Sequence, residues 1–149
     1  MNILQDIQKY FTIDELVCPH IYNRDRNIAY NYLDKDLLKV LLFIRTKLGK
    51  PIIINNYKSL GSYSQRGIRC NCCDLVKDKT LKNVLYYSTH MQGKAIDFDV
   101  KGLSAEEVRK WLKQHETEIP HPIRLEEKVN WIHIDTRVTN NKKIETFID

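Results

Sequence analysis

One segment of this chain carries most of the information about its fold and chemistry, namely Ser88-Thr89-His90-Met91-Gln92-Gly93-Lys94-Ala95-Ile96-Asp97-Phe98-Asp99. A second segment, Trp131-Ile132-His133-Ile134-Asp135, lies near the C-terminus. Apolar and polar residues alternate from residue 95 onward in the first segment and throughout the second, as in strands with one face in the core and one toward water. His90, Asp97 and His133 are residue types that hold a divalent metal while one coordination position stays open. The two segments therefore predict a metallohydrolase.

The same alternation predicts how these side chains meet. Asp97 lies on the polar face of its strand, because the residues on either side of it are apolar and face the core. His133 lies on the polar face of the second strand for the same reason. If the two strands are neighbours, Asp97 and His133 converge, and Gly93 allows the tight turn that brings His90 to them. We expect a rigid site with three ligands.

At 149 residues the chain is long enough to bury its own core, and no repeat or linker divides it, so we expect a single domain over residues 1–149. Capping boxes at residues 12–15 and 104–107 each predict the start of a helix, and a third helix is expected over residues 36–48. The expected strands are 51–58, 95–100, 123–126, 131–136 and 144–148. Residues 59–87 are polar and aperiodic, which predicts a functional loop or lid. Because helices lead and antiparallel strands follow, the expected class is α+β, with an antiparallel sheet packed against helices.

Charge and hydropathy limit the partners. The net charge is +5, but the basic residues are scattered, so we interpret most of them as solvated surface, although a basic surface also suits an anionic cell wall. Without a basic stripe interleaved with aromatic residues, we expect no nucleic-acid partner. The longest apolar run, 40–44, is too short to span a membrane. Residues 1–9 lack the pattern of a signal peptide, so we expect synthesis in a host cytoplasm.

The motifs resemble those of a known family. The pattern S-x-H-x-x-G-x-A-x-D, followed by W-x-H-x-D, is similar to that of the zinc D-Ala-D-Ala carboxypeptidases and L-Ala-D-Glu endopeptidases. This family includes the vancomycin-resistance dipeptidases and many phage endolysins, and it shares its fold with the Hedgehog signalling domain. Residues 11–18 also resemble the family's opening F-x-x-x-E-x-x-C. The resemblance covers most of the chain and is closest to short phage-encoded members.

This resemblance implies a function. His90, Asp97 and His133 would bind one zinc ion per chain, while Ser88 and Trp131 would contact the substrate. The substrate would be a peptide bond in the stem peptides of bacterial peptidoglycan. The protein would then act at the bacterial cell wall as a phage or prophage endolysin, either as a carboxypeptidase or as an endopeptidase. The sequence does not indicate its oligomeric state.

The catalytic base departs from the family pattern. In the vancomycin-resistance branch a glutamate stands three residues before the second histidine, and here that residue is Asn130, which cannot accept a proton. A hairpin with residues 127–130 as its loop pairs Glu126 with Trp131 and places Arg124 opposite His133. We therefore expect Glu126 to be the base, with Glu127 as the alternative.

A second departure concerns the basic group that steadies the developing oxyanion. Lys58 occupies the position of an arginine in the family's S-G-Y-R-S segment, so we expect Lys58 or Arg124 to provide this charge. Asp99 and Asp135 are expected to accept hydrogen bonds from ligand N–H groups or from these basic residues. Asn130 and Lys58 also support an alternative function, a catalytically silent virion or interaction module that keeps the fold.

The cysteines allow two interpretations. In a chain without a secretion signal, the four cysteines are expected to be reduced thiols. The alternative is a closed structural zinc site formed by Cys70-x-x-Cys73 together with Cys18-Pro19-His20. The second pair is tighter than the usual spacing of zinc ligands, so free thiols are the expected state.

Overall fold

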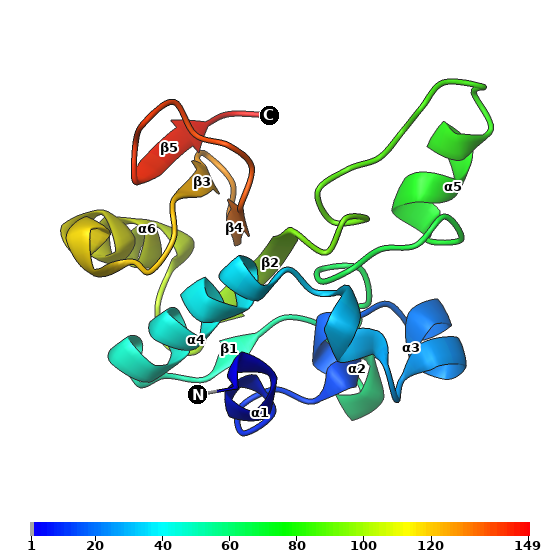
Figure 1. The fold of residues 1–149 in the computed structure, drawn as a ribbon, viewed down its shortest axis with the longest axis horizontal. Helices are drawn as coiled ribbons and strands as arrows, with labels where there is room; N and C mark the ends of the chain where they lie inside the picture. Colours follow the sequence, from blue (N-terminus) through cyan, green and yellow to red (C-terminus); the bar gives the residue numbers. More distant parts are fainter. Residues whose placement is uncertain (1) are drawn as a thin grey trace.

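The structure of the chain is a computed structural model that describes residues 2–149 (Figure 1). Its α-helices are α1 (Ile3–Ile7), α2 (Ile13–Leu16), α3 (Pro19–Asp25), α4 (Lys35–Leu48), α5 (Asp74–Thr80) and α6 (Ala105–Gln114). Short 3-10 helices cover Ala29–Tyr32, Tyr57–Ser59 and Glu116–Glu118. The strands are β1 (Ile52–Ile53), β2 (Ala95–Val100), β3 (Ile123–Glu126), β4 (Ile132–Asp135) and β5 (Ile144–Phe147). Within residues 2–149, no helix combines the length and apolarity needed to cross a membrane.

The five strands form one sheet in the order β1-β2-β4-β3-β5. The first three pairings are antiparallel, whereas β3 and β5 are parallel. The parallel pairing arises because residues 136–143 lead the chain from β4 past β3 to the free edge of β3, where β5 runs opposite to β4. The predicted α+β class is confirmed, although the sheet is mixed rather than wholly antiparallel.

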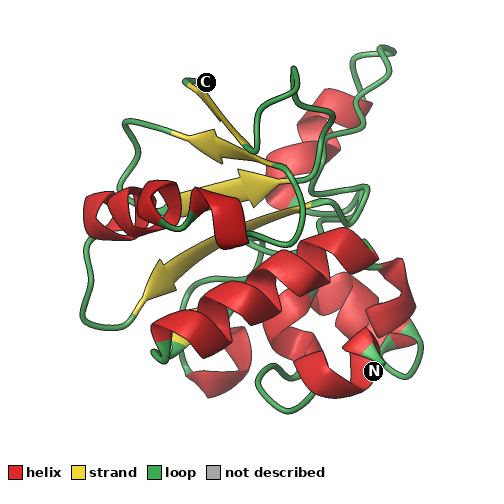
Figure 2. Cartoon of the chain, turned by 60° about the vertical axis from the view of Figure 1, so that its left-hand side comes forward, coloured by secondary structure: helices red, strands yellow, loops and turns green. Residues whose placement is uncertain are grey.

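The two faces of the sheet differ in character. On one face Ile96 pairs with Ile134 and Phe98 with Ile132, and all four side chains are buried in the main core. The helices α4 and α6 cover this face (Figure 2), and they contribute to the same core Leu37, Val40, Leu41, Ile44, Val108 and Leu112. The other face carries the polar residues of β2, β3 and β4, and it is left free for a site.

Local signals define the two covering helices. Asp34 caps α4 by accepting hydrogen bonds from the amides of Asp36 and Leu37, and Gly49 ends the helix with a left-handed φ of 69°. Ser104 and Glu107 form the predicted capping box at the start of α6. The predicted helix over 36–48 is thus present and begins one residue earlier.

Two predictions for the N-terminal half are wrong in extent. The strand expected over 51–58 is reduced to Ile52–Ile53, because Asn55 forms its hydrogen bonds with residues outside the sheet. Its amide N–H donates to the Glu15 carbonyl (3.1 Å), and its side chain donates to the Val17 carbonyl (3.0 Å) and accepts from the Arg66 amide (2.9 Å). The segment 59–87, expected to be a loop throughout, contains α5.

The hairpin of β3 and β4 also differs from the prediction. Arg124 pairs with Asp135 and Leu125 with Ile134, so the register continued by one residue brings Glu126 opposite His133. The predicted pairing of Arg124 with His133 is therefore wrong by two residues. Two residues are one full period of a strand, so Arg124 and Glu126 still lie on the polar face, as expected.

Arg109 explains why the loop between β3 and β4 is longer than the predicted four residues, 127–130. This arginine of α6 is 4% exposed. Its guanidinium donates to the carbonyl of Val129 (2.7 Å) and to that of Trp131 (3.0 Å). Lys128, the residue before Val129 in the loop, adopts a left-handed φ of 63°. The loop carbonyls are thus paired with a buried side chain rather than with the opposite strand, which accounts for the register.

Arg109→Ala should lower the free energy of unfolding by about 2–3 kcal/mol, because two loop carbonyls lose their buried donor. The matched control is Lys110→Ala at the exposed neighbouring position of α6. We expect this control to change stability by less than about 0.5 kcal/mol. Urea denaturation measures both variants, and equal stabilities would contradict the role given to Arg109.

Candidate active site

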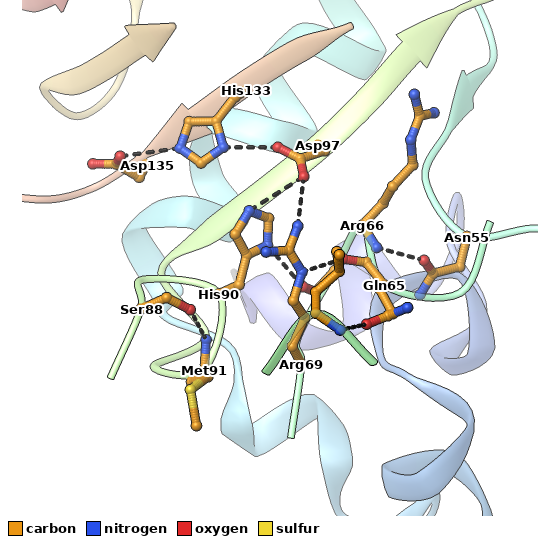
Figure 3. Close-up of polar contacts among 12 residues, drawn as sticks. Asn55, Gln65, Arg66, Arg69, Ser88, His90, Met91, Asp97, His133 and Asp135 are labelled. Atoms are coloured by element: carbon orange, nitrogen blue, oxygen red, sulfur yellow. Dashed lines mark hydrogen bonds and ion pairs between the residues drawn. The ribbon is translucent and has the colours of Figure 1, made fainter. Parts of the chain in front are cut away.

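The three predicted ligand residues lie together on the polar face of the sheet (Figure 3). One ligand atom from each of His90, Asp97 and His133 lies within 4.8 Å of the other two. Asp97 stands between the histidines: its Oδ2 is 3.3 Å from His90 Nε2, and its Oδ1 is 2.7 Å from His133 Nδ1. All three residues are buried. The cross-strand pairing of Asp97 with His133 brings together residues that lie far apart in the sequence.

Each histidine turns its other ring nitrogen to an acceptor. His90 Nδ1 donates to the Gly67 carbonyl (2.9 Å), and His133 Nε2 lies 3.1 Å from the Asp135 carboxylate. With those nitrogens occupied, His90 Nε2 and His133 Nδ1, which face Asp97, are the nitrogens that would bind a metal ion. Metal-ligating histidines are oriented in this way, by a hydrogen bond from the nitrogen that does not bind the metal. The donor set therefore fits a zinc ion.

The electrostatics of this group are strongly coupled. Burial disfavours the ionised form of Asp97, but hydrogen bonds from His133 and His90 outweigh it and hold the pKa of Asp97 well below its usual range. Burial likewise disfavours the imidazolium of His133, yet hydrogen bonds to Asp135 and Asp97 raise its pKa to about 9. Asp97 and Asp135 thus stabilise positive charge at His133, and a bound metal cation would take the place of that proton.

Two glycines allow the first histidine to reach the sheet. Gly93 has a left-handed φ of 69°, and a Cβ at this position would lie 2.1 Å from the Tyr32 carbonyl oxygen. A Cβ on Gly67, whose carbonyl accepts from His90, would lie 2.0 Å from the Leu16 carbonyl oxygen. Both positions accept only a residue without a side chain, because the backbones approach so closely.

Arg69 is a site residue that the sequence analysis missed. Its Nη2 donates to Asp97 Oδ2 (3.0 Å), and its Nε donates to the carbonyl of Gln65. The nearby Arg66 donates to Asp99 (2.7 Å). The available signal was charge pairing, since two arginines three residues apart face two aspartates on the polar face of β2. Neither the resemblance nor the local pattern marks Arg69.

His90, Asp97 and His133, together called the ligand group, lie in a cleft with a volume of about 840 Å³. Besides the three ligand residues, the cleft is lined by Arg69, Lys79, Leu85, Tyr86, Tyr87, Ser88, Thr89, Arg124, Glu126, Trp131, Asp135, Arg137, Phe147, Ile148 and Asp149. The structure therefore brings four further predicted site residues to the cleft, namely Ser88, Arg124, Glu126 and Trp131. Arg124 lies with its guanidinium 4.1 Å from the centroid of the Phe147 ring.

Lys58 does not reach this cleft, contrary to the prediction. Residues 57–59 form a short 3-10 helix, and the Lys58 ammonium lies over the Tyr22 ring, 5.0 Å from its centroid. The chain leaves the sheet edge at Asn55, before Lys58, and this departure carries the lysine away. Arg69, rather than Lys58, is the basic side chain beside the ligand group.

The two candidate bases lie in different environments. Glu126 lines the cleft, and burial raises the pKa of its carboxyl group. Within residues 2–149, no hydrogen bond or ion pair engages this carboxylate. Glu127 instead accepts a hydrogen bond from Lys113, which lowers its pKa, and it does not line the cleft. Of the two, Glu126 is the carboxylate that faces the ligand group.

A buried carboxylate between two oriented histidines, on the polar face of an α+β sheet and in an open cleft, is an arrangement typical of metal-dependent hydrolases. Residues 86–135 match a family model described as Peptidase M15. The match covers less than half of the chain, but this segment holds all three predicted ligand residues. The similarity agrees with the resemblance seen in the motifs and supports a metallopeptidase. A search of curated proteins gave no match, nor did a search of solved structures.

Replacing Asp97 or His133 with alanine should remove one equivalent of bound zinc per chain, because two donors remain where three are needed. His115→Ala is the control, since this histidine stacks on Trp111 and does not line the cleft. Elemental analysis of the purified variants measures the metal. Undiminished zinc in both ligand variants would contradict the assignment.

Proposed function

We propose that this protein is a zinc-dependent peptidase that hydrolyses peptide bonds in the stem peptides of bacterial peptidoglycan, as a phage or prophage endolysin. The observation that carries the proposal is that the ligand group and an unpaired glutamate, Glu126, share one cleft. The M15 family match supports the reaction class. The net charge of +5 is consistent with an anionic cell wall.

His90, Asp97 and His133 would hold the metal. When bound, zinc acts as a Lewis acid that polarises the scissile carbonyl and activates water. The protein supplies the orientation: the Gly67 carbonyl and the Asp135 carboxylate fix the rings of His90 and His133. Such supporting hydrogen bonds keep a site rigid enough for catalysis.

Glu126 would serve as the proton carrier. The register of β3 and β4 places it opposite His133, on the face of the sheet that bears the metal ligands. Since its carboxylate has no partner among the described residues, it is available to accept a proton from the attacking water and to deliver it to the leaving amine. A raised pKa suits both steps, because the group must gain and lose a proton near neutral pH.

Basic and aromatic groups around the cleft suit a peptide that carries carboxylates. Arg69, Arg124 and Arg137 line it together with Lys79. The Arg124 guanidinium is held by the Phe147 ring and lies 4.0 Å from Asp135, so its position is defined before substrate binds. Arg69 or Arg124 would steady the developing oxyanion in place of Lys58. Trp131 and Ser88 would contact the substrate beside the metal.

The alternative is a catalytically silent module that retains the fold. Asn130, at the position of a family glutamate, supports this alternative. However, Glu126 lines the cleft and would replace the carboxylate that Asn130 lacks. Arg69 supplies a positive charge near the ligands and would replace the one expected from Lys58. We therefore favour the enzyme.

The proposal is tested with purified protein and peptidoglycan fragments, whose products are identified by mass spectrometry. Cleavage that stops on addition of a chelator and returns with zinc supports the peptidase. The mass of the products also distinguishes a carboxypeptidase from an endopeptidase and names the bond. Bound zinc at the histidine site without cleavage of any fragment would instead favour the silent module.

Glu126→Gln should retain zinc and fold but lower turnover by about 100-fold or more, because the proton carrier is lost. Glu127→Gln is the matched control, since it has the same chemistry one residue away and outside the cleft. We expect this control to keep close to the full rate in the peptidoglycan assay. A Glu126→Gln rate equal to that of the unmodified protein would place the base elsewhere.

The pH profile of kcat/KM provides a further prediction. Burial raises the pKa of Glu126, and the protonated carboxyl cannot accept a proton. Activity should therefore fall with decreasing pH through a pKa above the usual glutamate value of about 4.3. Zinc content is measured at each pH as a control, because protonated histidines release metal. Persistence of the same acid limb in the residual activity of Glu126→Gln would exclude Glu126 as its source.

A further inference from the structure

Outside the cleft, the structure brings together a second set of metal-binding side chains. Cys18 and His20 lie at the start of α3, whereas Cys70 and Cys73 precede α5. One ligand atom from each of the four lies within 4.8 Å of the others. The chain spacing disfavours such a site, but the fold joins the two pairs through a parallel bridge between Val17 and Ile68. The Cys18 amide donates to the Ile68 carbonyl beside it (3.0 Å).

The distances within this cluster match those of a tetrahedral zinc site. The Sγ atoms of Cys70 and Cys73 are 3.9 Å apart, and His20 Nδ1 lies 3.4 Å from Cys70 Sγ and 3.8 Å from Cys73 Sγ. Zinc–sulfur bonds of about 2.3 Å and zinc–nitrogen bonds of about 2.0–2.1 Å at tetrahedral angles place sulfurs about 3.8 Å apart and sulfur about 3.5 Å from nitrogen. The side chains are thus spaced as around one ion.

We propose that Cys18, His20, Cys70 and Cys73 bind a structural zinc ion, which would be a second zinc in addition to the one at the histidine–aspartate site. Three sulfurs and one imidazole make a closed set of four ligands with no open position, which is typical of structural zinc. Hydrogen bonds to sulfur support it, because the amides of Cys70 and Cys72 donate to Cys73 Sγ and Cys70 Sγ, each at 3.4 Å.

No disulfide joins the cysteines of this cluster. A bond between Cys70 and Cys73 requires sulfurs about 2.0 Å apart, far closer than the 3.9 Å between them. All four cysteines are free thiols in the structure. Cys72 is exposed and is not part of the cluster, so it provides a cysteine control within the same loop.

The position of the cluster indicates what the metal would do. The only buried residue of α5 is Val76, which belongs with Cys18 and Cys73 to a small core separate from the main one. In Figure 1, α5 and the loop that follows it extend away from the sheet. Residues 77–85 are all exposed. A zinc ion would therefore replace a hydrophobic core as the anchor of this segment.

This segment also forms one wall of the cleft. Lys79, Leu85, Tyr86 and Tyr87 line it, and His90 follows closely in the chain. The same zinc would fix Arg69, because Cys70 is the next residue. The second zinc would thus hold this wall of the cleft and Arg69 in place, while taking no part in the reaction.

Cobalt replacement tests the site without reference to peptidase activity. Protein kept reduced, stripped of metal and loaded with Co²⁺ should show sulfur-to-cobalt charge-transfer absorption in the near ultraviolet, because three cysteines bind the ion. The histidine–aspartate site has no sulfur and cannot give this band. The band should persist in Asp97→Ala, so loss of the proposed catalytic metal and loss of the structural metal are distinguished. Absence of the band in the unmodified protein would overturn the proposal.

The zinc content of variants provides a second test of the site. The unmodified protein and Cys72→Ser should hold two zinc ions per chain, and Cys70→Ser should hold one. His20→Ala, at an exposed position, opens one coordination site and should lose zinc to a chelator concentration that the unmodified protein resists. Trypsin should also cleave within residues 77–82 faster in Cys70→Ser than in Cys72→Ser. Unchanged zinc in both Cys70→Ser and His20→Ala would overturn the site.

Discussion

The pairing of β2 with β4 places Asp97 directly across from His133, and the candidate site is built around this contact. Because side chains alternate along a strand, the same pairing sets Ile96 against Ile134 and Phe98 against Ile132 on the opposite face. One register therefore supplies both the core beneath α4 and α6 and the charged group above it. A shift by one residue would bury the aspartate and expose the isoleucines, so core burial enforces the geometry of the proposed metal ligands.

The β3–β4 hairpin can differ from its predicted register by two residues and keep each side chain on the same face, whereas the pairing of Asp97 with His133 allows no such shift. Its loop is longer than the sequence indicates, because the buried guanidinium of Arg109 binds the carbonyls of Val129 and Trp131. The register moves by two residues, which preserves the faces and brings Glu126 instead of Arg124 opposite His133. The replacement of a family glutamate by Asn130 is thereby compatible with a carboxylate in the cleft.

The N-terminal half of the chain supports the site from outside the sheet. The Gly67 carbonyl orients His90, and Arg69 contacts Asp97, so the segment after β1 forms part of the candidate metal site. This segment buries few apolar side chains around α5. The thiol and imidazole cluster at its base offers a means of anchoring it, which connects two sites that lie in different parts of the fold.

Strand and helix periodicity, the capping residues and the spacing of His90, Asp97 and His133 were readable from the sequence, because each depends on neighbours within a few residues along the chain. The α+β class and the polar face of β2 followed from them. The sequence offered a zinc site of Cys18, His20, Cys70 and Cys73 only as the alternative to free thiols. Whether these four side chains converge, and where Lys58 and Arg69 lie, could not be read from it. These depend on Asn55 leaving the sheet edge and on the bridge between Val17 and Ile68, which are contacts between distant segments. Local pattern carries no information on such contacts, since they are selected by packing of the whole chain.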